Sequence, residues 1–313
     1  MSNLLFSHCI NPFTPQGNSE YGLAQKVTFA SMRRALIESN AHNIGVEIIA
    51  VVYPEDEPIV EPPAIPIPKL CRSVQDFQIL NPVRRLPLLK DILDIAALEG
   101  KGDYLIFSNI DISLQPHFYL DIKNIIEQSD DNNFACTITR RNVSSQFKNI
   151  KNIEQELSLM YAANSHPHPG CDCFIFPRRY VKNMNLGNIT IAVRHFDQLL
   201  LANLDAISGF NFHWYRNLFL TFHIGNDRTW VWQIDYEEFN LNEALKAMEQ
   251  IRKKFDIPKG SACHRSYKIF KEETKPTKKI IRQLKRISLL VKLLRWLRED
   301  ILHQTRYNHQ KLD

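Results

Sequence analysis

The residues best suited to do chemistry come directly after an apolar run in the first half of the chain. Tyr104–Phe107 is continuously apolar, and Asn109 and Asp111 follow it. Such a run is typical of a strand buried on both faces of a sheet. A carboxylate at the carboxyl end of such a strand lies where ligands usually bind, and it is costly to bury unless paired or bound to a cation. Asp111 is therefore the first candidate for a binding role; its structural alternative is to cap the next turn.

Three further polar residues stand at the predicted ends of strands or helices. Asp172 enters a strand after a proline-rich turn, Asp197 lies in the first turn of a helix, and His223 ends an aromatic strand. Each has a structural alternative, because Asp172 can hydrogen-bond the turn, Asp197 can cap its helix, and His223 can be a hydrogen-bonded core residue. His166 and His168 have the i, i+2 spacing of metal ligands, but the prolines beside them favour rigid turn residues.

The elements that must position these residues alternate between strand and helix from residue 4 to about residue 205. Strands are predicted at 4–10, 46–53, 104–114, 133–139 and 171–176, and helices at 25–38, 84–100, 118–128, 153–163 and 194–206, with a last helix at 242–253. Segment 54–68 carries six prolines and predicts a long extended loop. The alternation implies crossover connections and a mainly parallel α/β sheet with helices on both faces.

Length and composition agree with one large α/β domain plus an appendage. The chain has 313 residues, a hydrophobic fraction of 44% and a net charge of +5. Of its six cysteines only Cys171 and Cys173 are close together, and C-x-C without a second pair is a poor zinc signature. We therefore expect reduced thiols in a cytoplasmic protein. We expect neither a signal peptide at the N-terminus nor a membrane-spanning segment.

The C-terminal segment is strongly basic. Residues 275–298 include nine Lys or Arg and no acidic residue, and the apolar stripe that begins Ile280, Leu284, Ile287 has helical spacing. A basic amphipathic helix with a tryptophan, here Trp296, is typical of helices that lie on a membrane surface. Packing against protein is the main alternative, and nucleic acid is not expected as a partner because no recognition motif accompanies the charge. We therefore predict two domains, 1–260 and a basic helical extension 261–313, with membrane contact through 275–301.

These residues resemble those of the GT-A fold, the fold of nucleotide-sugar-dependent glycosyltransferases. Asn109-Ile110-Asp111 is similar to the D-x-D-type motif of that fold, with Asn in the first position. His223 resembles the late histidine that completes metal coordination in many such enzymes. Asp197 resembles the acidic residue that opens a late helix and acts as general base in inverting members. The resemblance covers roughly residues 4–230, and the Asn in place of the first Asp implies weaker metal binding.

The resemblance implies an enzyme that transfers a sugar from a nucleotide-diphosphate sugar to an acceptor hydroxyl. Asp111 and His223 would bind Mn²⁺ or Mg²⁺, because a divalent cation neutralises the charge of the departing diphosphate. Asn109 would bind the donor, and Asp172 and Asp197 would be catalytic. Three pairs of adjacent arginines stand near the ends of predicted elements. Because Arg binds phosphate oxygens in bidentate fashion, we expect Arg84 and Arg140, each the first residue of its pair, to bind the diphosphate.

We expect a role in surface glycan or glycolipid synthesis, because a membrane-bound extension suits an acceptor that is a glycan or is linked to lipid. The chain would then be cytoplasmic and peripheral at the inner face of the membrane. Two rivals remain. A nucleotidyltransferase calls for a glycine-rich, basic first loop, and 11–22 holds two glycines and neither Lys nor Arg. A non-catalytic, membrane-associated binding protein of the same fold would explain the weakened D-x-D motif.

Overall fold

The structure, a computed structural model, describes residues 5–15, 20–129, 133–143, 147, 150, 152–224, 234–284 and 286. The chain divides into two compact units, Met1–Tyr267 and Lys268–Asp313. Every candidate site residue named above belongs to the first unit. The predicted domain boundary after residue 260 stays a prediction.

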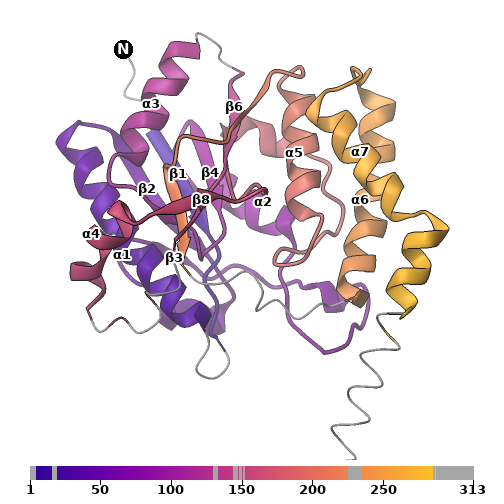
Figure 1. The fold of residues 1–313 in the computed structure, drawn as a ribbon, viewed down its shortest axis with the longest axis horizontal. Helices are drawn as coiled ribbons and strands as arrows, with labels where there is room; N and C mark the ends of the chain where they lie inside the picture. Colours follow the sequence, from indigo (N-terminus) through magenta and orange to yellow (C-terminus); the bar gives the residue numbers. More distant parts are fainter. Residues whose placement is uncertain are drawn as a thin grey trace, which may run out of the picture. The chain divides into compact units, whose positions relative to one another are not determined.

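A seven-stranded sheet forms the centre of the first unit within the described residues (Figure 1). Its strands, in spatial order, are β10 (Phe212–Tyr215), β6 (Ala135–Ile138), β9 (Cys173–Pro177), β4 (Tyr104–Ser108), β1 (Leu5–Ile10), β2 (Gly45–Val51) and β3 (Ile65–Ile67). β9 runs antiparallel to both of its neighbours, and the other four pairings are parallel. The prediction of a mixed, mainly parallel sheet is confirmed.

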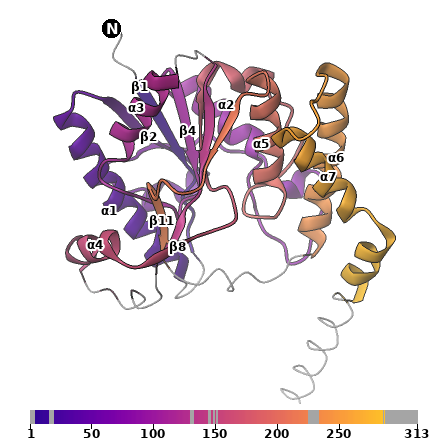
Figure 2. The same ribbon diagram turned by 45° about the horizontal axis from the view of Figure 1, so that its top comes forward.

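Helices cover both faces of this sheet, as Figures 1 and 2 show. On one side lie α1 (Glu20–Ala41) and α3 (Phe118–Ser129), and on the other lie α2 (Leu89–Glu99) and α5 (Phe196–Ile207). On the first side Phe29 of α1 and Phe118 of α3 join Phe6 of β1 in one buried cluster. Each large apolar side chain buried in this way stabilises the fold by roughly 1.5–3 kcal/mol.

The remaining helices lie outside these layers. α4 (Ile153–Ala162) packs against α1, and α6 (Ile234–Lys254) packs against α5. α7 (Ala262–Glu273) follows α6 along the chain and includes the boundary between the two units. Three short 3-10 helices are also present: η1 (Pro54–Ile59), η2 (Val74–Asp76) and η4 (Arg178–Asn183).

A second, four-stranded sheet stands at the carboxyl end of β4. Its spatial order is β5 (Ser113–Leu114), β11 (Thr221–Ile224), β7 (Arg141–Val143) and β8 (Ser165–Pro167). β5 and β11 are antiparallel, β11 and β7 are parallel, and β7 and β8 are antiparallel. This small sheet brings together chain segments more than a hundred residues apart, and its strand β11 carries the candidate residue His223.

Two predicted elements differ from the structure. The strand predicted at 104–114 is two strands, because the chain turns after β4 and the Ile112 amide donates to the Asn109 carbonyl at 3.0 Å. The predicted extended loop 54–68 contains η1 and the strand β3. β3 lies at the edge of the sheet, where a proline removes no ladder hydrogen bond that the sheet needs.

The basic C-terminal segment is described only in part. Residues 276–284 and 286 are helical, and Ile280, Ile281 and Leu284 are exposed. The rest of the helix predicted across 275–301 lies outside the described residues. No helix in the described part of the chain is both long and apolar enough to cross a membrane.

Candidate active site

The two predicted metal ligands, Asp111 and His223, lie next to each other. Asp111 sits in the turn between β4 and β5. β5 pairs with β11 through Ser113 and Phe222, and this register sets the next residue of β11, His223, beside the turn. The imidazole Nε2 lies 3.2 Å from the Asp111 Oδ2, with side-chain exposures of 11% and 22%. The pair is therefore sheltered while part of each side chain still reaches solvent.

Electrostatics favour the carboxylate form of Asp111. Burial acts to raise its pKa, but the hydrogen bond and charge of His223 and the charge of Arg140 outweigh burial, so the pKa falls below its ordinary value. Asp111 is thus ionised at neutral pH. An ionised carboxylate held beside an imidazole is a group that can bind a cation or the cationic end of a ligand.

Asp172 and Arg140 form a second, more deeply buried pair. Asp172 directly precedes β9, which pairs with both β4 and β6, so it lies between the ends of those strands. Its Oδ1 lies 2.9 Å from the Arg140 Nη1, and the two side chains are only 11% and 8% exposed. The Arg140 Nε also donates to the Asn142 Oδ1 at 3.2 Å. Arg140 therefore already has carboxylate and amide partners within the protein.

Asn109, two residues before Asp111, links the Asp111–His223 pair to the Asp172–Arg140 pair by hydrogen-bonding Asp172. Its backbone amide donates to the Asp172 carbonyl at 3.3 Å, and its side-chain Nδ2 donates to the Asp172 Oδ1 at 3.4 Å. Burial is the main cause that raises the pKa of Asp172, and the charge of Asp111 raises it further, while Arg140 opposes both. Asp172 Oδ2 is buried and has no hydrogen-bond partner among the described residues. The buried Asp172 therefore uses one oxygen and leaves the other for a further donor.

Asp197 stands in the first turn of α5, where acidic residues interact favourably with the helix dipole. The N-cap position of this helix is held by His195, which adopts the left-handed conformation at φ 84° and makes no side-chain capping hydrogen bond. Burial first, and then the negative charge of Asp172, raise the pKa of Asp197 to about 6. Because the charge of Asp172 contributes to the pKa of Asp197, the two carboxyl groups interact electrostatically. A carboxyl group with a pKa near 6 is suited to general base catalysis.

Arg84 makes its described hydrogen bonds through its backbone. It is an exposed residue between η2 and α2, and its backbone amide donates to the Tyr236 hydroxyl at 2.9 Å. Its role in binding a diphosphate stays a prediction.

Two residues of the site lie outside the set of predicted site residues. The His168 Nδ1 lies 3.7 Å from the Asp172 Oδ2, although the prolines beside His168 favoured a purely structural turn. Asn142, the partner of Arg140, pairs in register with His223 across β7 and β11. The i, i+4 spacing of His168 and Asp172 was a usable signal, whereas the position of Asn142 depends on strand pairing that the local sequence does not specify.

A buried histidine on the neighbouring strand β1 contacts the last residue of β4. His8 of β1 is fully buried and lies 2.8 Å from the Ser108 hydroxyl and 2.9 Å from the Tyr119 hydroxyl. Burial lowers the pKa of His8 to about 3, so the ring is neutral and acts as one donor and one acceptor. Because Ser108 directly precedes Asn109, this contact helps to hold the backbone at the start of the site.

The donor atoms fit a divalent cation only in part. Asp111 and His223 supply one carboxylate and one imidazole, and no group of three His, Cys, Asp or Glu suited to a metal occurs in the described residues. A hard cation commonly takes one or two protein ligands and completes its shell with substrate phosphate oxygens and water. The pair therefore fits Mn²⁺ or Mg²⁺ if a diphosphate supplies further oxygens.

No family model matches the sequence, and no curated protein is similar to it in sequence. Solved structures do resemble the fold. TarS residues 1–349 from S. aureus, in complex with UDP-GlcNAc, are 9% identical, with a TM-score of 0.50 over 88% of this chain and 74% of that one. Glucosyl-3-phosphoglycerate synthase from M. tuberculosis is 10% identical, with a TM-score of 0.43 over 83% of each chain. The catalytic domain of Drosophila β1,4-galactosyltransferase 7 is 8% identical, with a TM-score of 0.41 over 76% and 79%.

The first of these similarities, together with the sheet order, defines the fold. The chain has the GT-A-like fold of nucleotide-sugar glycosyltransferases. At this level of identity the similarity concerns the fold alone, so the activity has to be argued from the site.

Proposed function

We propose that the protein is a glycosyltransferase that moves a sugar from a nucleoside-diphosphate sugar to an acceptor hydroxyl. The observation that carries this proposal is the contact of Asp111 with His223, 3.2 Å apart, at the carboxyl end of a central strand of a GT-A-like sheet. Ligands of α/β sheets bind at such strand ends. The neighbouring Asp197, whose pKa is raised to about 6, supplies a base of suitable strength.

In this proposal the oxygen of the acceptor hydroxyl bonds to the anomeric carbon of the sugar, and Asp197 takes the proton of that hydroxyl. The bond from that carbon to the diphosphate breaks, and the negative charge moves to the leaving diphosphate. Asp111 and His223 would hold a divalent cation, which when bound neutralises part of that charge. Asn109 and Asp172 would position the donor, and the Arg140 guanidinium, buried beside both carboxylates, would add positive potential.

The acceptor that we propose is a glycan or a lipid-linked molecule at the cytoplasmic face of a membrane. The support is the charge of the segment 275–298, with nine Lys or Arg and no acidic residue. Exposed Ile280 and Leu284, one helical turn apart, give the described part of that helix an apolar side. Such a segment would hold the protein near an acceptor embedded in the membrane.

The test is nucleotide binding by the full-length protein. We would measure thermal shifts with UDP, GDP and CDP, each with and without Mn²⁺, for the unmodified protein, Asp111→Asn and Asp121→Asn. Asp121 is a half-buried residue of α3 that lies outside the site, with its side chain 40% exposed, and it serves as the matched control. We expect one nucleotide to raise the melting temperature in a Mn²⁺-dependent way, with the shift lost in Asp111→Asn and kept in Asp121→Asn. If no nucleotide shifts the unmodified protein, the non-catalytic binding protein is the better interpretation.

A further inference from the structure

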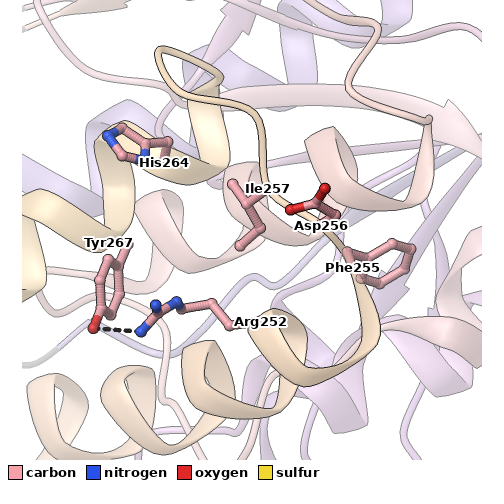
Figure 3. Close-up of a pocket in the computed structure, with 6 residues that line it drawn as sticks. All are labelled: Arg252, Phe255, Asp256, Ile257, His264 and Tyr267. Atoms are coloured by element: carbon pink, nitrogen blue, oxygen red, sulfur yellow. Dashed lines mark hydrogen bonds between the residues drawn. The ribbon is translucent and has the colours of Figure 1, made fainter.

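A cavity of about 320 Å³ lies at the corner between α6 and α7 (Figure 3). Its walls come from the last turn of α6, the connecting segment and the first turns of α7: Arg252, Phe255, Asp256, Ile257, His264 and Tyr267. None of these residues belongs to the site around Asp111. The volume is at the lower end of the range for small-molecule pockets.

One wall of the cavity presents an arginine that is held in place. Arg252 Nη1 donates to the Tyr267 hydroxyl at 2.7 Å, and its guanidinium carbon lies 4.4 Å from the centroid of the same ring. Figure 3 shows the two side chains side by side, joined by this bond. The hydrogen bond uses one of five guanidinium N–H groups. A guanidinium ordered before binding loses less conformational freedom when it binds a phosphate or carboxylate.

A second wall presents a histidine nitrogen that lacks a partner. The Nε2 of His264 is buried and makes no hydrogen bond with any described residue. His264 precedes Tyr267 by three residues on α7, so the two side chains lie on one face of the helix. A buried polar atom without a partner is rare, and it indicates a water or ligand atom at that position. His264 thus lines the cavity together with Arg252 and carries a nitrogen without a partner among the described residues.

The surroundings favour an anion that also carries hydroxyl groups. The last turn of α6 is entirely basic at 252–254, and Lys259 and Arg265 are exposed nearby, so positive charge prevails around the cavity. Asp256 is the acidic exception, and its exposed carboxylate can accept hydrogen bonds from hydroxyl groups. Phe255 and Ile257 add apolar side chains to the lining, and apolar surface of this kind suits the C–H face of a sugar ring.

We propose that this corner is a second ligand site, and that it takes a phosphorylated carbohydrate. Arg252 and His264 bind the phosphate, Asp256 accepts hydrogen bonds from sugar hydroxyls, and Phe255 with Ile257 contacts the ring. The site does not depend on the proposed transfer reaction, because it shares no residue with the Asp111 network.

The test is isothermal titration of the full-length protein with glucose 6-phosphate, glucose and inorganic phosphate. We expect glucose 6-phosphate to bind more tightly than phosphate, and glucose to show no measurable binding. Arg252→Gln should weaken glucose 6-phosphate binding by roughly tenfold or more, because a charge-assisted bond is lost. Lys253→Gln removes the same charge from a neighbouring residue that does not line the cavity, and it should change the affinity by less than about twofold, as expected for an exposed charge.

Two further variants make the assignment specific. His264→Gln should weaken both phosphate and glucose 6-phosphate, and Asp256→Asn should reduce the preference for glucose 6-phosphate over phosphate. Circular dichroism would confirm that each variant is folded. The proposal is overturned if the unmodified protein binds none of the three compounds. It is also overturned if Arg252→Gln and Lys253→Gln weaken binding equally, because binding would then reflect the general positive charge of the surface.

Discussion

Asp197 is the residue whose ionisation should set the pH dependence of transfer. Its pKa is raised to about 6, so it becomes a base only as pH rises through that value. We expect kcat/KM to fall about tenfold per pH unit below 6 and to level off above it. Asp197→Asn should remove this limb and lower kcat by about 10²–10⁴-fold. A pH–rate profile, with exposed Asp94→Asn as control, tests this; an unchanged limb in Asp197→Asn would rule Asp197 out as the base.

The same raised pKa also affects stability: whereas the activity should rise with pH, the contribution of Asp197 to stability should fall. The folded protein holds the Asp197 proton more tightly than the unfolded chain does, whose ordinary value is 3.8. Between about pH 4 and pH 6 the folded state therefore binds more protons, and the contribution of Asp197 to stability falls as pH rises. Asp197→Asn should flatten this part of the stability profile.

Arg140 and Asp172 should stabilise the fold as a unit. Both side chains are nearly buried and 2.9 Å apart, so removing either partner leaves an uncompensated charge. We expect Arg140→Met or Asp172→Asn alone to destabilise the protein by about 3–5 kcal/mol. The double variant should be less destabilised than the sum of the two by about 1–3 kcal/mol. Urea unfolding measures these energies, and strictly additive values would contradict the direct pairing.

The candidate residues could be selected from sequence because they follow predicted strands or open a predicted helix. What could not be predicted is which of them touch. Asp172 meets Asn109 and Arg140 only because β9 lies antiparallel between β4 and β6. Strand pairing over such distances depends on the packing of the whole sheet, and no local pattern specifies it.

At the scale of elements, the long periodic helices and the buried strands were predictable, and the ends of strands were not. The alternation from Ser108 to Leu114 indicated a continuing strand, but the chain turns at Asn109 and re-forms a strand in another sheet. Alternating polarity arises wherever successive side chains face opposite environments, and a turn between two sheets produces it as well. The edge strand β3 could not be recognised because it contains Pro66 and is flanked by further prolines, which usually indicate a loop.

The residue Gly102, just before β4, lies so close to β1 that there is no room for a side chain. A methyl group added at Gly102 would lie 2.4 Å from the Ser7 backbone nitrogen, and the Gly102 amide donates to the Ser7 hydroxyl at 2.7 Å. Gly102→Ala should therefore destabilise the protein by about 1–3 kcal/mol, because backbone atoms of β1 cannot easily move. Denaturant unfolding measures the effect.

The control is Gly22→Ala in α1. The nearest atom to an added methyl group there is the Pro15 Cγ at 3.5 Å, an ordinary contact. Since alanine is the better helix former, this substitution should be neutral or stabilising by up to about 1 kcal/mol. Equal losses of stability for the two variants would show that the β1–β4 contact is not the cause.

At the scale of the whole molecule, the basic extension should determine where the protein works. We expect the full-length protein to bind vesicles that contain phosphatidylserine and not vesicles of phosphatidylcholine alone. Replacing Lys278 and Lys279 with Gln should weaken binding by about 2 kcal/mol, or roughly 30-fold, at about 1 kcal/mol for each lysine. Co-sedimentation measures this.

The matched control for the vesicle experiment is the Lys253→Gln, Lys254→Gln double variant. It loses the same charge from α6, which belongs to the other unit. A similar loss of binding in both double variants would indicate that net charge, and not the extension, directs the protein to membranes.

The antiparallel placement of β9 also has a bearing on how the protein is made. β6 pairs only with β9 and β10 in the described sheet, so residues 135–138 gain their first strand partner when residues 173–177 have left the ribosome. A nascent chain of about 170 residues therefore carries an unpaired apolar segment beside a half-built sheet. During this interval the unpaired segment is exposed to aggregation and to chaperone capture.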